Sequence, residues 1–311
     1  MRRAVSIAVV ALSMASAPEV RSQDRLPRQT SQPAFRAGVD LISLNVTVTD
    51  SARRFVTTLD QQDFLVLEDG HPQAVTFFMR TGLPVTVAIV VDTSASMAGA
   101  LATAQESAIG FVRRLRPDDR AAVVDFDSRV RILQSFTSDQ PALERAIRST
   151  IADGSTALYN AVYISLNELT KLARSDIDAP GRRAIVLLSD GEDTSSLMNL
   201  EEVLDAANRS DTAIYTIGLG ERDAQGRLAK HDAEFALRRL AQQTGGRSFF
   251  PNDLNQLAGI YNEITNELAS QYALAYASSN GRRDGQWRRI SIRLAQRDLA
   301  ARTKPGYFGP R

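Results

Sequence analysis

The chain has 311 residues, of which 43% are hydrophobic and 23% charged. These fractions lie near the averages of about 45–50% and about 25% for globular proteins, so a mostly disordered chain is excluded. Thirty-seven basic and 36 acidic residues give a formal net charge of +1, which does not indicate a nucleic-acid-binding protein. The chain has no cysteine and two histidines, so disulfides, Cys-ligated zinc and thiol nucleophiles are excluded and oxygen is the metal-ligating atom on offer.

The first 22 residues have the features of a secretory signal peptide. Arg2 and Arg3 precede an apolar run at 4–17. A membrane-spanning helix needs about 20 apolar residues, whereas a signal-peptide core needs about 7–15. We predict cleavage after Ser22, a polar linker at 23–35, and an exported bacterial protein that is periplasmic or secreted. The alternative is an uncleaved amino-terminal anchor; no transmembrane segment is expected in the mature chain.

Residues 36–80 predict a region of β-strands. Alternating apolar and polar residues at 39–48 predict a half-buried strand. Short apolar stretches at 55–56, 64–67 and 74–78 predict further strands, and no helix-length pattern occurs before residue 80.

Residues 81–270 alternate between strand and helix patterns. Continuous apolar runs are typical of strands buried on both faces. Such runs occur at 85–91, 121–126, 184–188 and 213–219, and shorter strands are predicted at 130–133 and 247–250. Apolar residues spaced by three and four predict helices at 101–115, 141–150, 158–174, 200–208, 233–244 and 254–268. The expected fold class is α/β, with a doubly wound, mainly parallel sheet and helices on both faces.

Residues 271–311 return to β structure. Strands are predicted at 272–276, 287–294 and 300–303. Below about 40 residues a domain usually needs disulfides, metals or oligomerisation to bury a core. We therefore expect 36–80 and 271–311 to pack together as one small sandwich with the α/β domain inserted between them. Trp287, Tyr307 and Phe308 are expected in its core.

Three loops at the predicted carboxyl ends of the α/β strands combine carboxylates with hydroxyls. Ligand sites in open α/β sheets form beyond these strand ends. The oxygen-bearing side chains in the three loops are Asp92, Ser94, Ser96, Thr156 and Asp190. Mg²⁺ prefers about six oxygen ligands and usually keeps several waters. Since two carboxylates at most balance a divalent cation, such a site attracts an acidic ligand.

This pattern resembles the von Willebrand factor A domain with its metal-ion-dependent adhesion site. That family's site combines Asp-x-Ser-x-Ser, a distant Thr, and an Asp in a strand-end Asp-Gly turn. Here the matching positions are Asp92, Ser94, Ser96, Thr156 and Asp190. The resemblance covers about 81–270. It implies an exported adhesion module that binds Mg²⁺ or Mn²⁺. An Asp or Glu of an unidentified protein partner would complete the coordination of the metal.

The flanks are similar to those of a subgroup of exported acidobacterial proteins that carry A domains. The similar segments are LDQQDFLVLEDGHPQAVTFF at 59–78 and QYALAYASSN through KPGYF at 271–308. This similarity implies an architecture rather than a biochemical activity.

Several residues have simpler interpretations. Ser94 and Ser96 could cap the following helix, as serines often do. Asp125 and Asp127 could form a second acidic site, although a turn before the strand at 130–133 is favoured. We interpret the acidic residues after Asp190 as solvated turn residues that could tune the site from outside. They are Glu192 and Asp193. The histidines are expected on the surface, His71 in a turn and His231 at a helix start.

No enzyme motif accompanies these residues. A haloacid-dehalogenase-type phosphatase needs a second acid where this chain has Ser94. Neither G-x-S-x-G nor a phosphate-binding GxxxxGK[ST] loop occurs, so we predict a binding protein rather than an enzyme. The alternative function is a structural or assembly scaffold of the cell envelope, in which the metal only orders the loops.

Overall fold

The computed structural model describes residues 41–175, 182–190, 192–220 and 231–311. The predicted signal peptide at 1–22 and the predicted linker at 23–35 lie outside the described residues, and both stay predictions. Within the described ranges, no helix combines the length and the hydropathy that crossing a membrane requires.

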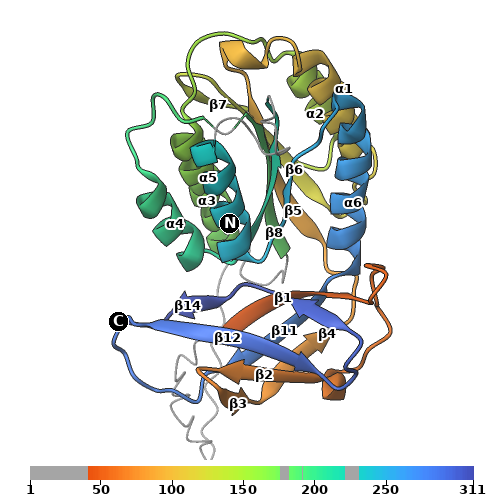
Figure 1. The fold of residues 1–311 in the computed structure, drawn as a ribbon, viewed down its shortest axis with the longest axis vertical. Coiled ribbons are helices and arrows are strands. Elements are labelled where there is room, and N and C mark those ends of the chain that lie inside the picture. The colour runs from red at the N-terminus through yellow and green to blue at the C-terminus, as the bar shows by residue number, and fades with distance from the viewer. Residues whose placement is uncertain (1–40, 176–181, 191, 221–230) are drawn as a thin grey trace, which may run out of the picture. The chain divides into compact units, whose positions relative to one another are not determined.

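Six strands form the central sheet in the order β10-β9-β8-β5-β6-β7 (Figure 1). They are β5 (Val85–Asp92), β6 (Arg120–Phe126), β7 (Val130–Thr137), β8 (Arg182–Ser189), β9 (Thr212–Gly218) and β10 (Ser248–Phe249). All neighbours are parallel except β7, which pairs antiparallel with β6. Asp92 is in register with Phe126, and Ser189 with Gly218. The carboxyl ends of β5, β6, β8 and β9 therefore meet at one edge of the sheet.

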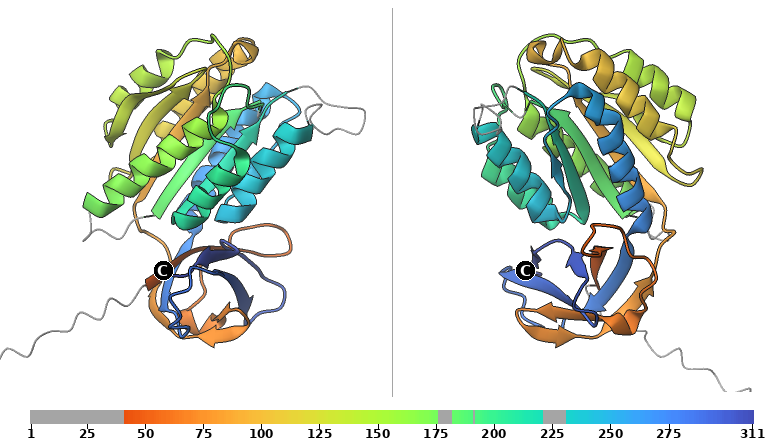
Figure 2. Two further views of the ribbon diagram at one scale, coloured as in Figure 1. Left: turned by 90° about the vertical axis from the view of Figure 1, so that its left-hand side faces the viewer. Right: turned by 45° about the vertical axis from the view of Figure 1, so that its right-hand side comes forward.

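Helices cover both faces of this sheet, as Figures 1 and 2 show. On one face lie α1 (Leu101–Val112), α2 (Gln140–Arg148) and α6 (Leu257–Ser270). On the other lie α3 (Leu158–Ser175), α4 (Leu200–Arg209) and α5 (His231–Thr244). Each face of the sheet packs against its helices in a separate hydrophobic core. Successive residues of β5 point into these two cores alternately, Ile89 into one and Val90 into the other. This two-sided burial explains the continuous apolar runs, and the predicted α/β class is confirmed.

The two chain ends form two four-stranded antiparallel sheets. Their orders are β13-β1-β11-β4 and β14-β12-β2-β3. The amino-terminal strands are β1 (Leu41–Thr49), β2 (Phe64–Glu68), β3 (His71–Gln73) and β4 (Val75–Met79). The carboxyl-terminal strands are β11 (Tyr272–Ala277), β12 (Trp287–Leu294), β13 (Ala300–Arg302) and β14 (Gly306–Phe308). Because β1 pairs with β11 and β2 with β12, each sheet combines both ends, as predicted.

The β region departs from the sequence prediction in four details. His71, which we expected in a turn, begins strand β3 and pairs with Glu68. Phe55 makes only an isolated bridge to Thr49, so no strand forms at 55–56. The short strand β14 was not anticipated. Trp287 is 36% exposed and packs edge-on against Phe308 with ring centroids 5.1 Å apart, so its placement in the core is wrong. The two-residue period of β12 turns Arg288 inward and Trp287 outward.

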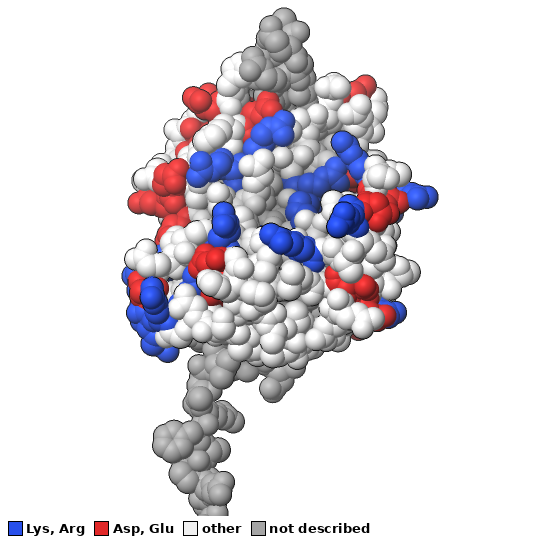
Figure 3. Space-filling model, turned by 60° about the horizontal axis from the view of Figure 1, so that its bottom comes forward, with Lys and Arg blue, Asp and Glu red and all other residues white. Residues whose placement is uncertain are grey.

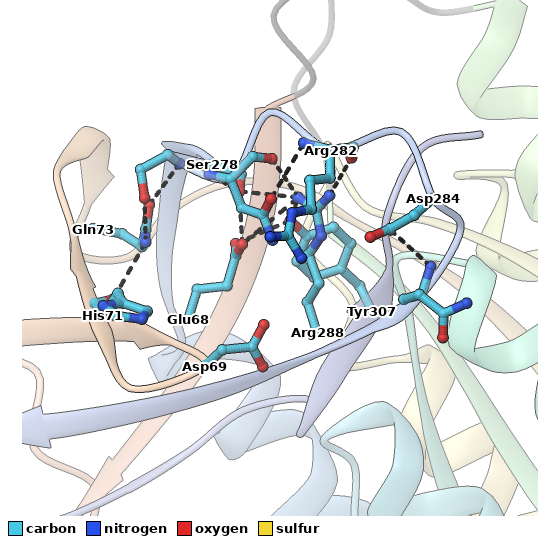
Figure 4. A network of polar contacts seen from close by, with 12 residues as sticks. Glu68, Asp69, His71, Gln73, Ser278, Arg282, Asp284, Arg288 and Tyr307 are labelled. Atoms are coloured by element: carbon cyan, nitrogen blue, oxygen red, sulfur yellow. Dashed lines mark hydrogen bonds and ion pairs between the residues drawn. The ribbon is translucent and has the colours of Figure 1, made fainter.

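A buried polar network lies inside the β region (Figure 4). Glu68 and Arg288 are each 2% exposed, and Arg288 Nη1 lies 3.6 Å from Glu68 Oε1. The hydroxyls of Tyr276 and Tyr307 donate to Glu68 Oε2 at 2.8 and 2.9 Å, and Ser278 donates to Oε1 at 2.6 Å. Each oxygen of this buried carboxylate thus has a donor.

Candidate metal centre

Asp92 ends β5 at the carboxyl edge of the central sheet and is 0% exposed. The Ser94 backbone N–H donates to its Oδ1 at 2.9 Å, and the Ser189 hydroxyl donates to its Oδ2 at 2.5 Å. Ser94 Oγ lies 3.1 Å from Ser96 Oγ. Ser94 is buried, whereas Ser96 is exposed. The first loop therefore gathers the carboxylate and both hydroxyls of the Asp-x-Ser-x-Ser motif.

The two serines do not cap a helix. Ser94 precedes a single 3₁₀ turn at Ala95–Met97 and makes no side-chain cap hydrogen bond, and α1 begins only at Leu101. The capping interpretation of these serines is wrong. Their hydroxyls remain available as oxygen ligands.

Thr156 is buried and is tied to the first loop through the backbone of its own loop. The Ala95 N–H donates to the Gly154 carbonyl at 3.0 Å, and the Asp153 N–H donates to the Thr93 carbonyl at 2.8 Å. Gly154 has φ +72°, a left-handed conformation that suits glycine, and this turn precedes Thr156. Thus the loop of Thr156 is hydrogen-bonded to the loop of Ser94, although no hydrogen bond joins the two side chains.

The third loop holds Thr156 from its other side. The Thr156 carbonyl accepts hydrogen bonds from the N–H groups of Thr194 and Ser195 at 2.9 and 3.0 Å. The Thr156 N–H donates to Thr194 Oγ1 at 3.0 Å. The three loops are therefore cross-linked mainly by their backbones.

Asp190 follows β8 and is mostly buried. Its Oδ1 accepts a hydrogen bond from the Glu192 N–H at 3.3 Å. Burial raises the pKa of Asp92 above its usual value, hydrogen bonds from Ser189 and Ser94 lower it, and the negative charge of Asp190 raises it. The charge of Asp190 therefore acts on the Asp92 carboxylate. Among the described residues, no lysine or arginine contacts Asp92.

Sequence reasoning missed two functions of residues near the site. Ser189 orients Asp92, but the sequence offers no signal beyond its position at the end of β8. Asp193 was interpreted as a solvated turn residue, which is wrong. Its Oδ1 accepts hydrogen bonds from the Tyr159 N–H at 3.3 Å and the Ser196 hydroxyl at 2.6 Å, so it anchors the third loop to the start of α3.

The possible second acidic site, Asp125 and Asp127, is held in ion pairs by Arg131. Asp125 lies within β6 rather than in a turn, and Arg131 of β7 contacts Asp125 at 2.6 Å and Asp127 at 3.0 Å. Burial acts against the charged form of Asp127, but hydrogen bonds and Arg131 leave its pKa below the usual value. No cluster of three or more His, Asp or Glu side chains suited to a metal occurs in the described ranges. The predicted site relies on hydroxyls for three of its five ligands.

Residues 86–263, more than half of the chain, match the model of the von Willebrand factor type A domain. The chain belongs to this family. A solved von Willebrand factor type A protein from Catenulispora acidiphila is 14% identical with a TM-score of 0.52, covering 89% of this chain and 76% of that one. This likeness supports the type A fold assigned to the central sheet and its helices.

Two bacterial relatives align with part of this chain. An uncharacterized protein of Synechocystis is 30% identical over 146 residues, which are 45% of this chain and 33% of that protein. A UPF0353 protein of Mycolicibacterium paratuberculosis is 26% identical over 228 residues, 67% of each chain. The chain thus spans about a third of the Synechocystis protein and about two thirds of the mycobacterial one. The family assignment is confirmed, while the acidobacterial subgroup stays a prediction.

Proposed function

We propose that this type A domain binds a divalent cation, Mg²⁺ or Mn²⁺, and through it an acidic side chain of a protein partner. The ligands would be Asp92, Ser94, Ser96, Thr156 and Asp190. A bound cation would supply an electrophilic position that accepts a carboxylate oxygen. Type A domains mediate protein–protein interactions, and the proposed exported location follows from the predicted signal peptide.

One observation carries the proposal. The Asp92 carboxylate is fully buried beside a second carboxylate, and its direct partners in the described structure are a hydroxyl and an amide. Burying a charge is costly unless it is paired or coordinates a metal. A hard cation with oxygen ligands matches these donors, because oxygen is the atom that Mg²⁺ prefers.

The scaffold alternative requires the metal to order the loops. The loops already share backbone hydrogen bonds from Ala95 to Gly154 and from Thr194 to Thr156. Because these hydrogen bonds already hold the loops together, a cation is not needed to order them. This favours a cation that captures a ligand.

Titration calorimetry tests the metal site. The wild-type chain should bind Mg²⁺ or Mn²⁺ saturably, and Asp92→Ala and Thr156→Ala should lose this binding. Asp153→Ala is the matched control, since this exposed carboxylate lies in the loop of Thr156 and, among the described residues, accepts a hydrogen bond only from its neighbour Gly154. Equal binding by Asp92→Ala and the wild type would show that the cation lies elsewhere.

Partner capture tests the second half of the proposal. Immobilised wild-type chain, incubated with an extract of the source cells, should retain a partner in Mg²⁺ and release it in EDTA. Asp92→Ala should retain none, and Asp153→Ala should behave as the wild type. Capture that is insensitive to both EDTA and Asp92→Ala would favour the scaffold function.

A further inference from the structure

A cavity lies away from the proposed metal centre. It has a volume of about 330 Å³. Its lining residues come from β1 and the turn after it, the end of α6, the segment before β10, and β13. They are Thr47, Thr49, Arg53, Phe55, Arg247, Glu267, Ala300, Ala301 and Arg302. Small-ligand sites have volumes of about 300–1,000 Å³, so this cavity fits a ligand at the small end of that range.

Glu267 forms the buried acidic wall of the cavity and is 0% exposed. Its Oε1 accepts hydrogen bonds from Tyr215 at 2.7 Å, Thr47 at 3.3 Å and Arg302 at 2.5 Å. Its Oε2 has no hydrogen-bond donor, and Arg247 Nη1 lies 3.9 Å from it. A buried acceptor without a donor is rare, and a ligand hydroxyl could satisfy it.

The cavity has an excess of positive charge. Arg302 is engaged by Glu267 and by the carbonyls of Gly245 and Gly246, and Arg247 pairs with Glu263 just outside the lining. Arg53 is exposed, and its guanidinium has no ion pair or hydrogen bond among the described residues. One unmatched cation therefore lines the cavity.

Local backbone geometry places Arg53 there. Arg53 has φ +61°, in the left-handed region that is uncommon for residues other than glycine. Its N–H donates to the Asp50 carbonyl at 2.9 Å, which closes the turn. The adjacent Arg54 is held instead by a salt bridge to Asp50 at 2.7 Å. Arg54 thus has an acidic partner, whereas Arg53 has none among the described residues.

On one face of the molecule the charged side chains are dispersed. Figure 3 shows lysine and arginine side chains at several separate places on one face, with acidic side chains beside many of them. Paired surface charges of this kind attract no particular ligand. The cavity differs because it combines an unmatched guanidinium with a buried, unsatisfied acceptor.

We propose that this cavity binds a small organic oxyanion that also carries a hydroxyl group, such as a sugar phosphate or a sugar acid. The anionic group pairs with the Arg53 guanidinium, which suits phosphate and carboxylate alike. A hydroxyl donates to Glu267 Oε2, and the carbon skeleton lies against Phe55, Ala300 and Ala301. This site is independent of the proposed metal centre.

Calorimetric titration of the full chain in EDTA tests the proposal without a contribution from bound divalent metal. The probes are glucose 6-phosphate, glucuronate, glucose and acetate. At least one of the two hydroxylated anions should bind saturably, and glucose and acetate should each bind at least tenfold more weakly. Which anion binds more tightly distinguishes a phosphate ligand from a carboxylate ligand.

Arg53→Ala should weaken binding of the preferred anion at least tenfold. Arg54→Ala is the matched control, since it removes an arginine of the same turn that is paired with Asp50, and it should bind as the wild type does. The proposal is overturned if neither hydroxylated anion binds, if acetate or glucose binds equally well, or if the two arginine variants bind alike. None of these results bears on the metal centre, because all are obtained in EDTA.

Discussion

The β region and the α/β domain each bury a carboxylate, and they satisfy it differently. Glu68 in the β region has Arg288 beside it and accepts hydrogen bonds from three hydroxyls. Asp92 in the α/β domain has one hydroxyl, one amide and a neighbouring negative charge. A carboxylate with a cation in its own chain serves stability. One that lacks such a cation, at the edge of a sheet where ligands bind, is suited to recruit one from solution.

The largest predicted effect tests the structural half of this comparison. Glu68→Ala leaves Arg288 buried without its charge partner, and breaking a buried pair costs about 3–5 kcal/mol. We expect a loss of this size in the free energy of unfolding, measured by urea denaturation. A loss below about 1 kcal/mol would mean that the network contributes no more than a surface ion pair.

Added metal should produce the next largest effect. A ligand that binds only the folded state at 100 times its dissociation constant stabilises it by about 2.7 kcal/mol. We expect Mg²⁺ to stabilise the wild type relative to EDTA by this amount and to leave Asp92→Asn unchanged, as measured by denaturation at matched ionic strength. Glu68→Gln is the control and should keep the full Mg²⁺ effect. Loss of the effect in both variants would remove the distinction between the two carboxylates.

Tyr276→Phe should have a smaller and pH-dependent effect. It removes one hydroxyl donor to Glu68 and should cost about 1.5 kcal/mol at neutral pH, the low end for a hydrogen bond to a charged group. Burial, assisted by the charge of Glu68, raises the pKa of Tyr276 above its usual value of about 10. Above pH 10 the unfolded wild type releases this proton and the folded one keeps it, so wild-type stability falls.

The difference between wild type and Tyr276→Phe should therefore shrink as pH rises above about 10. Urea denaturation between pH 7 and 11 measures it. Tyr163→Phe, at an exposed tyrosine, is the control and should follow the wild type at each pH. A constant difference across this range would contradict the assigned direction of the pKa shift.

An exposed ion pair should matter least. Glu106 of α1 contacts Arg148 of α2 at 2.6 Å, and both side chains are more than half exposed. Exposed pairs contribute about 0.2–1 kcal/mol, and 1 M salt shortens the Debye length to about 3 Å. Glu106→Ala should cost no more than this at low salt and almost nothing at 1 M salt. The cost of Glu68→Ala should change little with salt, since that pair is buried.

Sequence patterns predicted the strongly periodic elements well. The run at 85–91 became β5, and the helical spacing at 158–174 became α3. The short strand β14 and the lone bridge at Phe55 escaped prediction, because each depends on a partner strand rather than on a local pattern. Trp287 was misplaced because hydrophobicity alone does not tell which face of a strand points inward.

In the candidate site, too, local motifs could be predicted and contacts between distant residues could not. Asp-x-Ser-x-Ser is a local motif, so Asp92, Ser94 and Ser96 could be recognised as neighbours directly. The distant Thr156 and Asp190 required the rule that parallel strands end at one edge. Ser189 and Asp193 could not be assigned, since Asp92 lies 97 residues from Ser189, and Tyr159, through which Asp193 is anchored to α3, lies 34 residues from Asp193.

The sequence by itself determined that this chain has a parallel α/β core between β-rich ends, and that any metal site on it would have to use oxygen ligands. Periodicity and composition are local properties, so they can be interpreted without coordinates. Only the tertiary structure decided which buried charges are matched. Arg288 neutralises Glu68 across more than 200 residues of chain, and Arg53 reaches a cavity beside Glu267 without an acidic partner. Pairing of charges depends on distance in space, and that distance exists only once the chain has folded.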